Sequence, residues 1–221
     1  MNITREQLAQ AIDHTLLKPD AVFEDILRLC NEAKEHGFKA ICIQPCHVEG
    51  CARVLQGTEV VVATVIGFPL GANCTEVKAY ETRVALAQGA REIDMVINIG
   101  ALKARENERV YQDIKAVVEE AAKFPGSLVK VIIETVLLTE EEKVLACQLA
   151  LKAGAQFVKT STGFAGGGAT LEDVTLMVKV VGDQAKVKAS GGIKTKEQAL
   201  AYLAAGASRL GTSSGTAIVA E

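Results

Sequence analysis

The most constraining feature of this chain is a recurring unit of amphipathic helix, glycine and short apolar strand. The first clear copy has helical spacing of apolar residues over 20–33, then Gly37, then an apolar run over 40–44. Glycine commonly ends helices because it adopts the left-handed backbone conformation without steric cost. Short apolar runs bounded by such breakers indicate buried strands. Alternation of these helices and strands predicts a parallel sheet covered by helices.

Eight strands can be placed in this way, counting a brief one that follows a short N-terminal helix with a capping box at Thr4–Gln7. The expected strands cover 13–17, 40–44, 60–66, 93–98, 129–134, 157–161, 185–190 and 208–211. No linker, charge block or low-complexity tract separates them. We therefore predict an α/β fold: a single (β/α)8 TIM barrel domain over residues 1–221, with an extra short N-terminal helix.

An open doubly wound sheet is the alternative architecture. The barrel is favoured because the units are short and evenly spaced, and because no Gly-x-Gly-x-x-Gly fingerprint follows the first strand. In a barrel, the active site lies at the carboxyl ends of the strands. That rule selects the polar residues considered below.

Composition excludes several classes of partner. The net charge of −3 shows no basic excess, so neither nucleic acid nor an anionic membrane is an expected partner. The longest apolar stretch, 60–72, is interrupted by glycines and Pro69, which argues against a transmembrane helix. Residues 1–10 contain charges and no apolar segment, so we expect no secretory signal and a cytoplasmic location. The six scattered cysteines lack paired C-x-x-C spacing, which predicts reduced thiols and no metal site.

Two lysines, Lys159 and Lys188, lie near the ends of neighbouring apolar strands. A buried ammonium is costly unless it is paired or loses its proton, and a neutral lysine amine attacks carbonyl carbon. Side chains alternate along a strand, and the outer face must meet apolar helices, so both lysines should point into the barrel mouth. Two ammonium groups held close repel, and release of one proton would leave one amine nucleophilic.

A carboxylate, Asp94, lies in the otherwise apolar segment 92–98 and needs a partner. It could form an ion pair with Lys188, or move a proton through a bound water, and the two roles are compatible. The lysines also have a non-catalytic interpretation. They could pair with carboxylates such as Asp94 and Glu134 to stabilise the mouth, or bind phosphate as plain charges.

Small residues close strands seven and eight, where barrels often bind phosphate because glycines let the backbone approach the anion. The candidate substrate- and phosphate-binding residues at the strand ends are Thr15, Gly163, Gly191, Gly192, Gly211, Ser213 and Ser214. The glycines could alternatively serve only as tight turns. The glycine run 166–168 predicts a flexible loop that covers the site. The three isolated histidines, His14, His36 and His47, are expected to have surface or packing roles.

Six segments along nearly the whole chain together resemble one family, the deoxyribose-phosphate aldolases. These are Asp13–Leu17, Val65–Gly71, Glu92–Asn98, Lys130–Thr135, Val158–Phe164 and Val187–Ile193. The resemblance implies a class I aldolase on the (β/α)8 fold, without metal or organic cofactor. It implies that Lys159 forms the Schiff base, that Lys188 tunes it, and that Asp94 transfers protons. It also implies reversible cleavage of 2-deoxy-D-ribose 5-phosphate to glyceraldehyde 3-phosphate and acetaldehyde.

The leading hypothesis is therefore a Schiff-base lyase that acts on small sugar phosphates and aldehydes, and we expect a homo-oligomer, either dimer or tetramer. The alternative is a phosphate-binding barrel isomerase that uses lysine and aspartate without a covalent intermediate. A third class, a sugar-phosphate sensor without catalysis, leaves the lysine pair unexplained.

Overall fold

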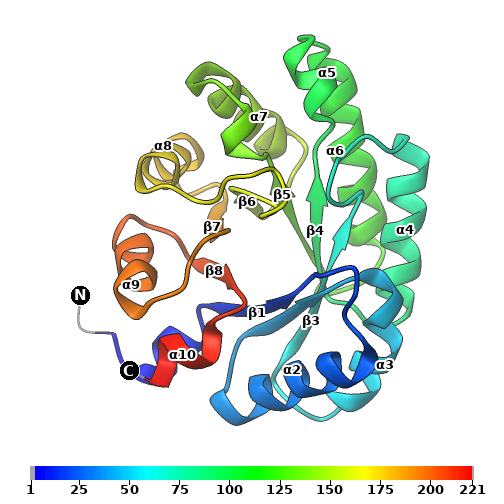
Figure 1. Cartoon of the computed structure of the whole chain (residues 1–221). Helices are drawn as coiled ribbons and strands as arrows, with labels where there is room; N and C mark the ends of the chain where they lie inside the picture. Colours follow the sequence, from blue (N-terminus) through cyan, green and yellow to red (C-terminus); the bar gives the residue numbers. More distant parts are fainter. Residues whose placement is uncertain (1–2, 221) are drawn as a thin grey trace.

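The computed structural model describes residues 3–220 and places eight parallel strands in a closed barrel in sequence order, ringed by helices (Figure 1). This confirms the predicted (β/α)8 class. The extent of one domain over residues 1–221 stays a prediction. The strands are β1 Ile12–Leu16, β2 Ala40–Ile43, β3 Val61–Ile66, β4 Glu92–Val96, β5 Leu128–Ile132, β6 Phe157–Lys159, β7 Lys186–Ser190 and β8 Arg209–Thr212.

The barrel closes where β1 pairs with β8, in register from Ile12 opposite Leu210 to His14 opposite Thr212. Strand residues alternate between helix-facing and interior positions. On β4, for example, Ile93 and Met95 join the main core under the helices, whereas Asp94 between them is fully buried on the other face. The barrel interior is therefore a separate compartment, and it carries most of the buried charge.

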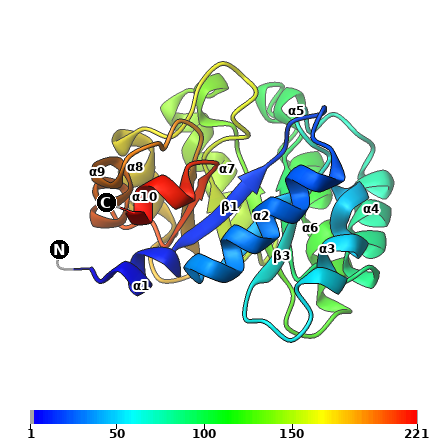
Figure 2. The same cartoon turned by 60° about the horizontal axis from the view of Figure 1, so that its bottom comes forward.

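The helices surround the strands (Figure 2), and their buried aliphatic residues belong to the same core as those of the strands. They are α1 Arg5–Ala9, α2 Phe23–His36, α3 Val48–Val54, α4 Thr75–Ala87, α5 Ile99–Lys103, α6 Asn107–Ala122, α7 Glu140–Lys152, α8 Leu171–Val181, α9 Lys196–Ala204 and α10 Gly215–Ala220, with 3-10 turns η1 Pro45–His47 and η2 Thr135–Leu137. None of the helices within residues 3–220 is long and apolar enough to cross a membrane.

The capping box predicted at Thr4–Gln7 is present, and threonines cap three further helices. Capping boxes form at Thr4, Thr139 and Thr195, and the Thr170 hydroxyl accepts from the Asp173 backbone N–H. The N-terminal helix ends at Ala9, shortly before β1 begins at Ile12. Several strands end one or two residues earlier than predicted. The apolar run after β4, for instance, continues into the unpredicted helix α5, whose N-cap is Asn98.

Candidate active site

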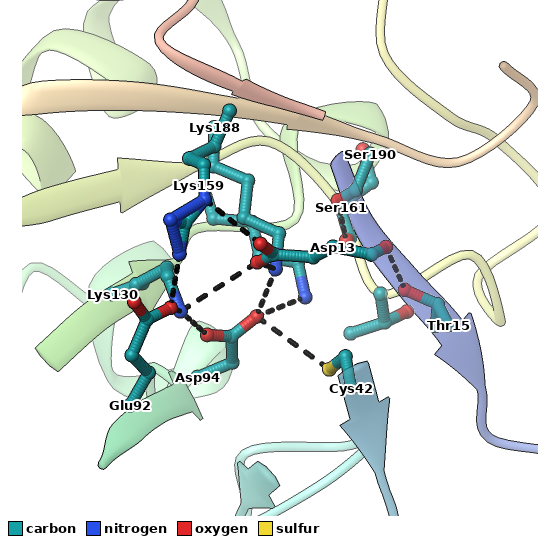
Figure 3. Close-up of polar contacts among 12 residues, drawn as sticks. Asp13, Thr15, Cys42, Glu92, Asp94, Lys130, Lys159, Ser161, Lys188 and Ser190 are labelled. Atoms are coloured by element: carbon teal, nitrogen blue, oxygen red, sulfur yellow. Dashed lines mark hydrogen bonds and ion pairs between the residues drawn. The ribbon is translucent and has the colours of Figure 1, made fainter. Parts of the chain in front are cut away.

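The barrel interior holds a network of seven buried charged side chains, which we call the charged network. Its members come from β1, β4, β5, β6, β7 and β8, and all have exposed fractions of 5% or less. Figure 3 shows most of them converging on one point inside the barrel. The members are Asp13, Glu92, Asp94, Lys130, Lys159, Lys188 and Arg209. The alternation that buries aliphatic residues under the helices also turns these residues inward.

Asp94 lies at the centre of the network. Its Oδ1 accepts from Lys130 Nζ at 2.7 Å, and its Oδ2 accepts from Lys159 Nζ at 2.7 Å and Lys188 Nζ at 2.8 Å. Burial alone would raise the pKa of Asp94, but the three ammonium groups outweigh burial and hold the pKa well below its ordinary value. Asp94 is therefore a fixed anion that gathers both lysines predicted from the sequence, and its predicted pairing with Lys188 is present.

Lys188 bridges two carboxylates, because its Nζ donates to Asp13 as well as to Asp94. Burial would lower the pKa of Lys188, but these two carboxylates overcome that effect and raise it. The ammonium of Lys188 is therefore retained. Lys188 is thus not a bare charge that repels Lys159, because Asp94 Oδ2 accepts from both amines.

Lys130 and Arg209 bridge carboxylates in the same way. Lys130 Nζ lies 2.6 Å from Glu92 Oε2 and 2.7 Å from Asp94 Oδ1, and Arg209 donates to Asp13 through Nε at 2.8 Å and to Glu92 through its terminal nitrogen. Burial opposes the charged form of each cation, but the carboxylates raise the pKa of both.

Lys159 differs from the other three cations. Its Nζ contacts one network oxygen, Asp94 Oδ2, and its side chain lines a cavity of about 210 Å³. The other three cations are not among the residues that line this cavity, within the described part of the chain. Lys159 is thus the member whose amine is held by a single carboxylate and reaches a space that can admit a small carbonyl compound.

The same cavity contains most of the predicted binding residues. Its lining includes Thr15, Gly191, Gly192, Gly211 and Ser213, together with the sequence-unpredicted Lys18, Phe164 and Lys194. Gly163 and Ser214 are not among the lining residues, and the Ser214 backbone N–H already donates to the Thr212 hydroxyl at 2.9 Å. The structure therefore brings five of the seven candidates around the Lys159 side chain.

The three glycines in this lining meet different requirements. Gly191 and Gly192 have φ of 89° and 80°, the left-handed region that favours glycine and turns backbone toward the cavity. At Gly211 a Cβ atom would lie 2.9 Å from Ser190 Cβ and 3.1 Å from Lys188 Cε. Gly211, which lies within β8, therefore makes room for the Lys188 side chain.

Sequence reasoning missed four members of the network, namely Asp13, Glu92, Lys130 and Arg209, as site residues. The available signal was the period-two alternation of strands: Glu92 lies two residues before Asp94 on β4, and Lys130 lies on the interior face of the next strand. Arg209 begins β8 and would have followed from the same rule. These four groups lie deeper in the barrel than the strand ends, where active-site residues are expected.

Glu134 pairs with neither lysine, contrary to the non-catalytic interpretation. It is 1% exposed and its backbone has a φ of 57°. Its carboxylate accepts from the Thr162 backbone N–H and hydroxyl, so it fixes the loop after β6.

The glycine run 166–168 in this loop also packs closely: a Cβ at Gly168 would lie 2.3 Å from the Gly191 carbonyl oxygen. Close backbone contact therefore accounts for Gly168, and the flexible cover over 166–168 stays a prediction.

His14 has the predicted packing role. It is 2% exposed on the helix-facing side of β1, its Nε2 lies 2.6 Å from Glu32 Oε2 on α2, and its ring lies 5.0 Å from that of Phe38. Burial is the main influence on its pKa, which is lowered. His14 therefore joins β1 to α2 outside the barrel interior.

Comparisons with known proteins relate the whole chain to one family of aldolases. The model of the DeoC/LacD family aldolases matches residues 7–221. The chain is 59% identical to deoxyribose-phosphate aldolase 1 of Bacillus licheniformis, over 97% of this chain and 95% of the relative. It is 57% identical to the deoxyribose-phosphate aldolase of Carboxydothermus hydrogenoformans, over 98% and 96% of the two chains. A solved structure of deoxyribose phosphate aldolase from Aeropyrum pernix, described as a tetramer, matches with a TM-score of 0.92 at 34% identity, covering 98% of this chain and 91% of that one.

Proposed function

The chain belongs to the DeoC/LacD family of aldolases, and from this premise we propose that it reversibly cleaves 2-deoxy-D-ribose 5-phosphate to glyceraldehyde 3-phosphate and acetaldehyde through a Schiff base on Lys159. One observation carries the assignment to Lys159. It is the cation of the charged network whose side chain lines the cavity, and a single carboxylate oxygen holds its amine.

The covalent steps balance without a cofactor. Neutral Lys159 Nζ attacks the C1 aldehyde of the open-chain sugar, and loss of water leaves a protonated imine. A base takes the proton of the C3 hydroxyl, the C2–C3 bond breaks, and its electron pair moves to the imine nitrogen. This step releases glyceraldehyde 3-phosphate and leaves an enamine. Protonation of the enamine at C2 and addition of water then release acetaldehyde and restore the amine.

Asp94 and Lys188 have complementary roles in this proposal. Asp94 Oδ2 lies 2.7 Å from Lys159 Nζ, so its negative charge stabilises the positive imine nitrogen that forms there. Lys188 donates to the same oxygen at 2.8 Å and so keeps a proton beside Asp94. A water between this pair and the sugar would carry the proton away from the C3 hydroxyl and later to C2.

The loops after β7 and β8 supply the proposed phosphate contact. Gly191 and Gly192 present left-handed backbone at the cavity, and Ser213 and Thr15 also line it. Lys18 and Lys194 are exposed cations at the rim of the same cavity. A phosphate held at this wall would leave the aldehyde end of the sugar free to reach Lys159, which positions the reacting carbon.

Assembly and location are also proposed. We propose a homo-oligomer, supported by the tetrameric description of the Aeropyrum pernix relative and by exposed apolar side chains such as Leu70, 73% exposed, and Tyr80, 59% exposed. We also propose a cytoplasmic location. The six cysteines within the described residues are free thiols, the state in which the reducing cytoplasm keeps cysteines. Light scattering of the purified protein tests the first proposal.

Turnover in the presence of borohydride tests the proposed reaction. The protein should consume 2-deoxyribose 5-phosphate, form glyceraldehyde 3-phosphate, and lose activity irreversibly when borohydride is added together with acetaldehyde. Borohydride without a carbonyl compound is the control and should leave activity intact. Sugar-phosphate turnover that resists borohydride in the presence of acetaldehyde would instead support isomerase chemistry without a covalent intermediate.

A further inference from the structure

The charged network contains unequal numbers of positive and negative groups. Four cations, Lys130, Lys159, Lys188 and Arg209, face three carboxylates, Asp13, Glu92 and Asp94. Among the described residues, Cys42 on β2 is the further titratable side chain in contact with the network, with its Sγ 3.9 Å from Asp94 Oδ2. Burial and Asp94 raise the pKa of Cys42, so it stays a neutral thiol. The residues of β3 that face the barrel interior, such as Ala63 and Val65, are apolar.

A buried surplus of one positive charge is unfavourable, because low-dielectric surroundings strengthen repulsion between like charges and penalise an uncompensated ion. Releasing a single proton from one lysine would make the network neutral. Three of the cations are poorly suited to release it, because Lys130, Lys188 and Arg209 each contact two or more carboxylates.

Lys159 can release a proton with the smallest loss of pairing. It shares its one carboxylate oxygen with Lys188, so Asp94 stays fully paired when the Lys159 amine becomes neutral. Its side chain also lines the cavity, which gives the departing proton a route to solvent. Both features distinguish it from the deeper cations.

We propose that the charge count of the whole network, rather than the Lys188 ammonium alone, releases the proton of Lys159, and that Lys130 is a positioning residue for this purpose. This inference rests on the proposed Schiff-base function. Lys130 lies one layer below the reacting amine and holds Asp94 Oδ1 and Glu92 Oε2. Lys130 adds one positive charge to the network and holds the Asp94 carboxylate in a fixed orientation.

Removing charges from the network in both directions tests the proposal. Lys130→Met leaves three cations and three carboxylates, so Lys159 should keep its proton to higher pH. The acidic limb of the kcat/KM profile should move upward by about one pH unit or more, giving a roughly tenfold loss at neutral pH that is recovered in alkaline buffer. Glu92→Gln should move the same limb to lower pH.

The double variant Lys130→Met, Glu92→Gln restores the surplus of one, and its limb should return toward that of the wild type. Lys130→Arg keeps the charge and should keep the limb in place. Lys78→Met is the matched control for loss of a buried paired lysine, because Lys78 pairs with Asp113 at 2.5 Å outside the barrel interior. It should lower stability without moving the limb.

The rate of borohydride trapping with acetaldehyde, measured against pH, reports the same proton on Lys159 independently of turnover. An activity loss in Lys130→Met that is uniform across pH, with trapping unshifted, would overturn the charge-count proposal and assign Lys130 a structural role. That outcome leaves the proposed function intact, whereas absence of any Lys159 adduct in the wild type would remove the function itself. Glu92→Gln keeps the size of the side chain, so the proposal stays testable if Lys130→Met does not fold.

Discussion

The two sides of the barrel interior differ in kind. One side, which we call the apolar wall, consists of Leu17, Ala40, Cys42, Ala63 and Val65, and follows β1 into β2 and β3. The other side is the charged network, which spans β4 to β8 and returns to Asp13 on β1. The two meet where the Cys42 thiol lies 3.9 Å from Asp94. Residues of both sides are buried, so exposure does not distinguish the two sides.

Energetics distinguish them instead. Burying the apolar wall stabilises the fold by about 25 cal/mol for each Å² removed from water. Buried ion networks carry a desolvation cost that their attraction seldom exceeds, and replacing one with well-packed apolar residues is often neutral or stabilising. Stability alone would therefore favour apolar residues on every strand. The charged network is better explained by the chemistry of Lys159 at its cavity end.

Loss of the nucleophile should give the largest effect. Lys159→Met should reduce aldol cleavage by at least about a thousandfold, because no other amine of the network reaches the cavity. The folded state should persist, since the remaining three cations balance three carboxylates. Steady-state turnover and circular dichroism measure the two quantities. Residual activity within about tenfold of the wild type would mean that another group forms the covalent bond.

Loss of the central carboxylate should be the most damaging change to stability. Asp94→Asn leaves three lysine amines without their shared carboxylate, and breaking a buried charge pair in this way costs about 3–5 kcal/mol. The matched change on the apolar wall, Val65→Ala, should cost about 2 kcal/mol through lost burial and cavity formation. Urea denaturation compares the two. Equal costs would remove the energetic distinction between the two sides.

Acid should weaken the charged side selectively. The pKa values of Asp94 and Asp13 are lowered in the folded protein, because the surrounding cations outweigh burial. The stability that these carboxylates contribute is therefore fully present above their ordinary pKa of about 4, and it is lost as the pH falls through the lowered folded values. Denaturation midpoints of the wild type should fall below about pH 4.

The control for this acid effect compares the pH dependence of stability in variants of the apolar wall and of the charged network. Val65→Ala keeps all the carboxylates, so its stability should fall with acid in parallel with the wild type. Asp94→Asn starts lower but should show a shallower dependence on pH. Parallel curves for wild type and Asp94→Asn would show that other carboxylates account for the acid sensitivity.

The boundary residue should give the smallest effect. Cys42→Ala removes one buried thiol at a long contact with Asp94, so the free energy of unfolding should fall by only about 1 kcal/mol. Its kcat/KM profile should keep the wild-type pH limb, because the neutral thiol adds no charge. A shifted limb would show that the apolar wall takes part in setting the charge of Lys159.

Much of the fold was predictable from the sequence because its signals are local. Gly37 ends a helix through its own φ of 67°, and capping boxes fix helix starts within four residues. Lys159, Lys188 and Asp94 were found because charged residues are conspicuous in apolar runs. The sequence predicted the pairing of Asp94 with Lys188, but not that Lys159 would contact the same carboxylate oxygen. Contacts between side chains of β4, β6 and β7 depend on the shear of the barrel.

The remaining site residues depend on contacts between distant segments. Arg209 and Asp13 are 196 residues apart and meet only because the barrel closes. The role of Gly211 depends on the side chain of Lys188 on the neighbouring strand, and that of Glu134 on a loop 28 residues away. No periodicity within one segment carries such information. Similarly, the net charge of the barrel interior can be calculated only when every residue that points into it is known.

Peptide mapping of the borohydride-trapped protein tests the central claim most directly. After reduction in the presence of acetaldehyde, the intact mass should rise by one reduced two-carbon adduct, and the modified peptide should carry it on Lys159. Lys159→Met should remain unmodified under the same conditions, while Lys78→Met should be trapped like the wild type. An adduct found on Lys188 or Lys130 instead, or on no lysine of the charged network, would contradict the account.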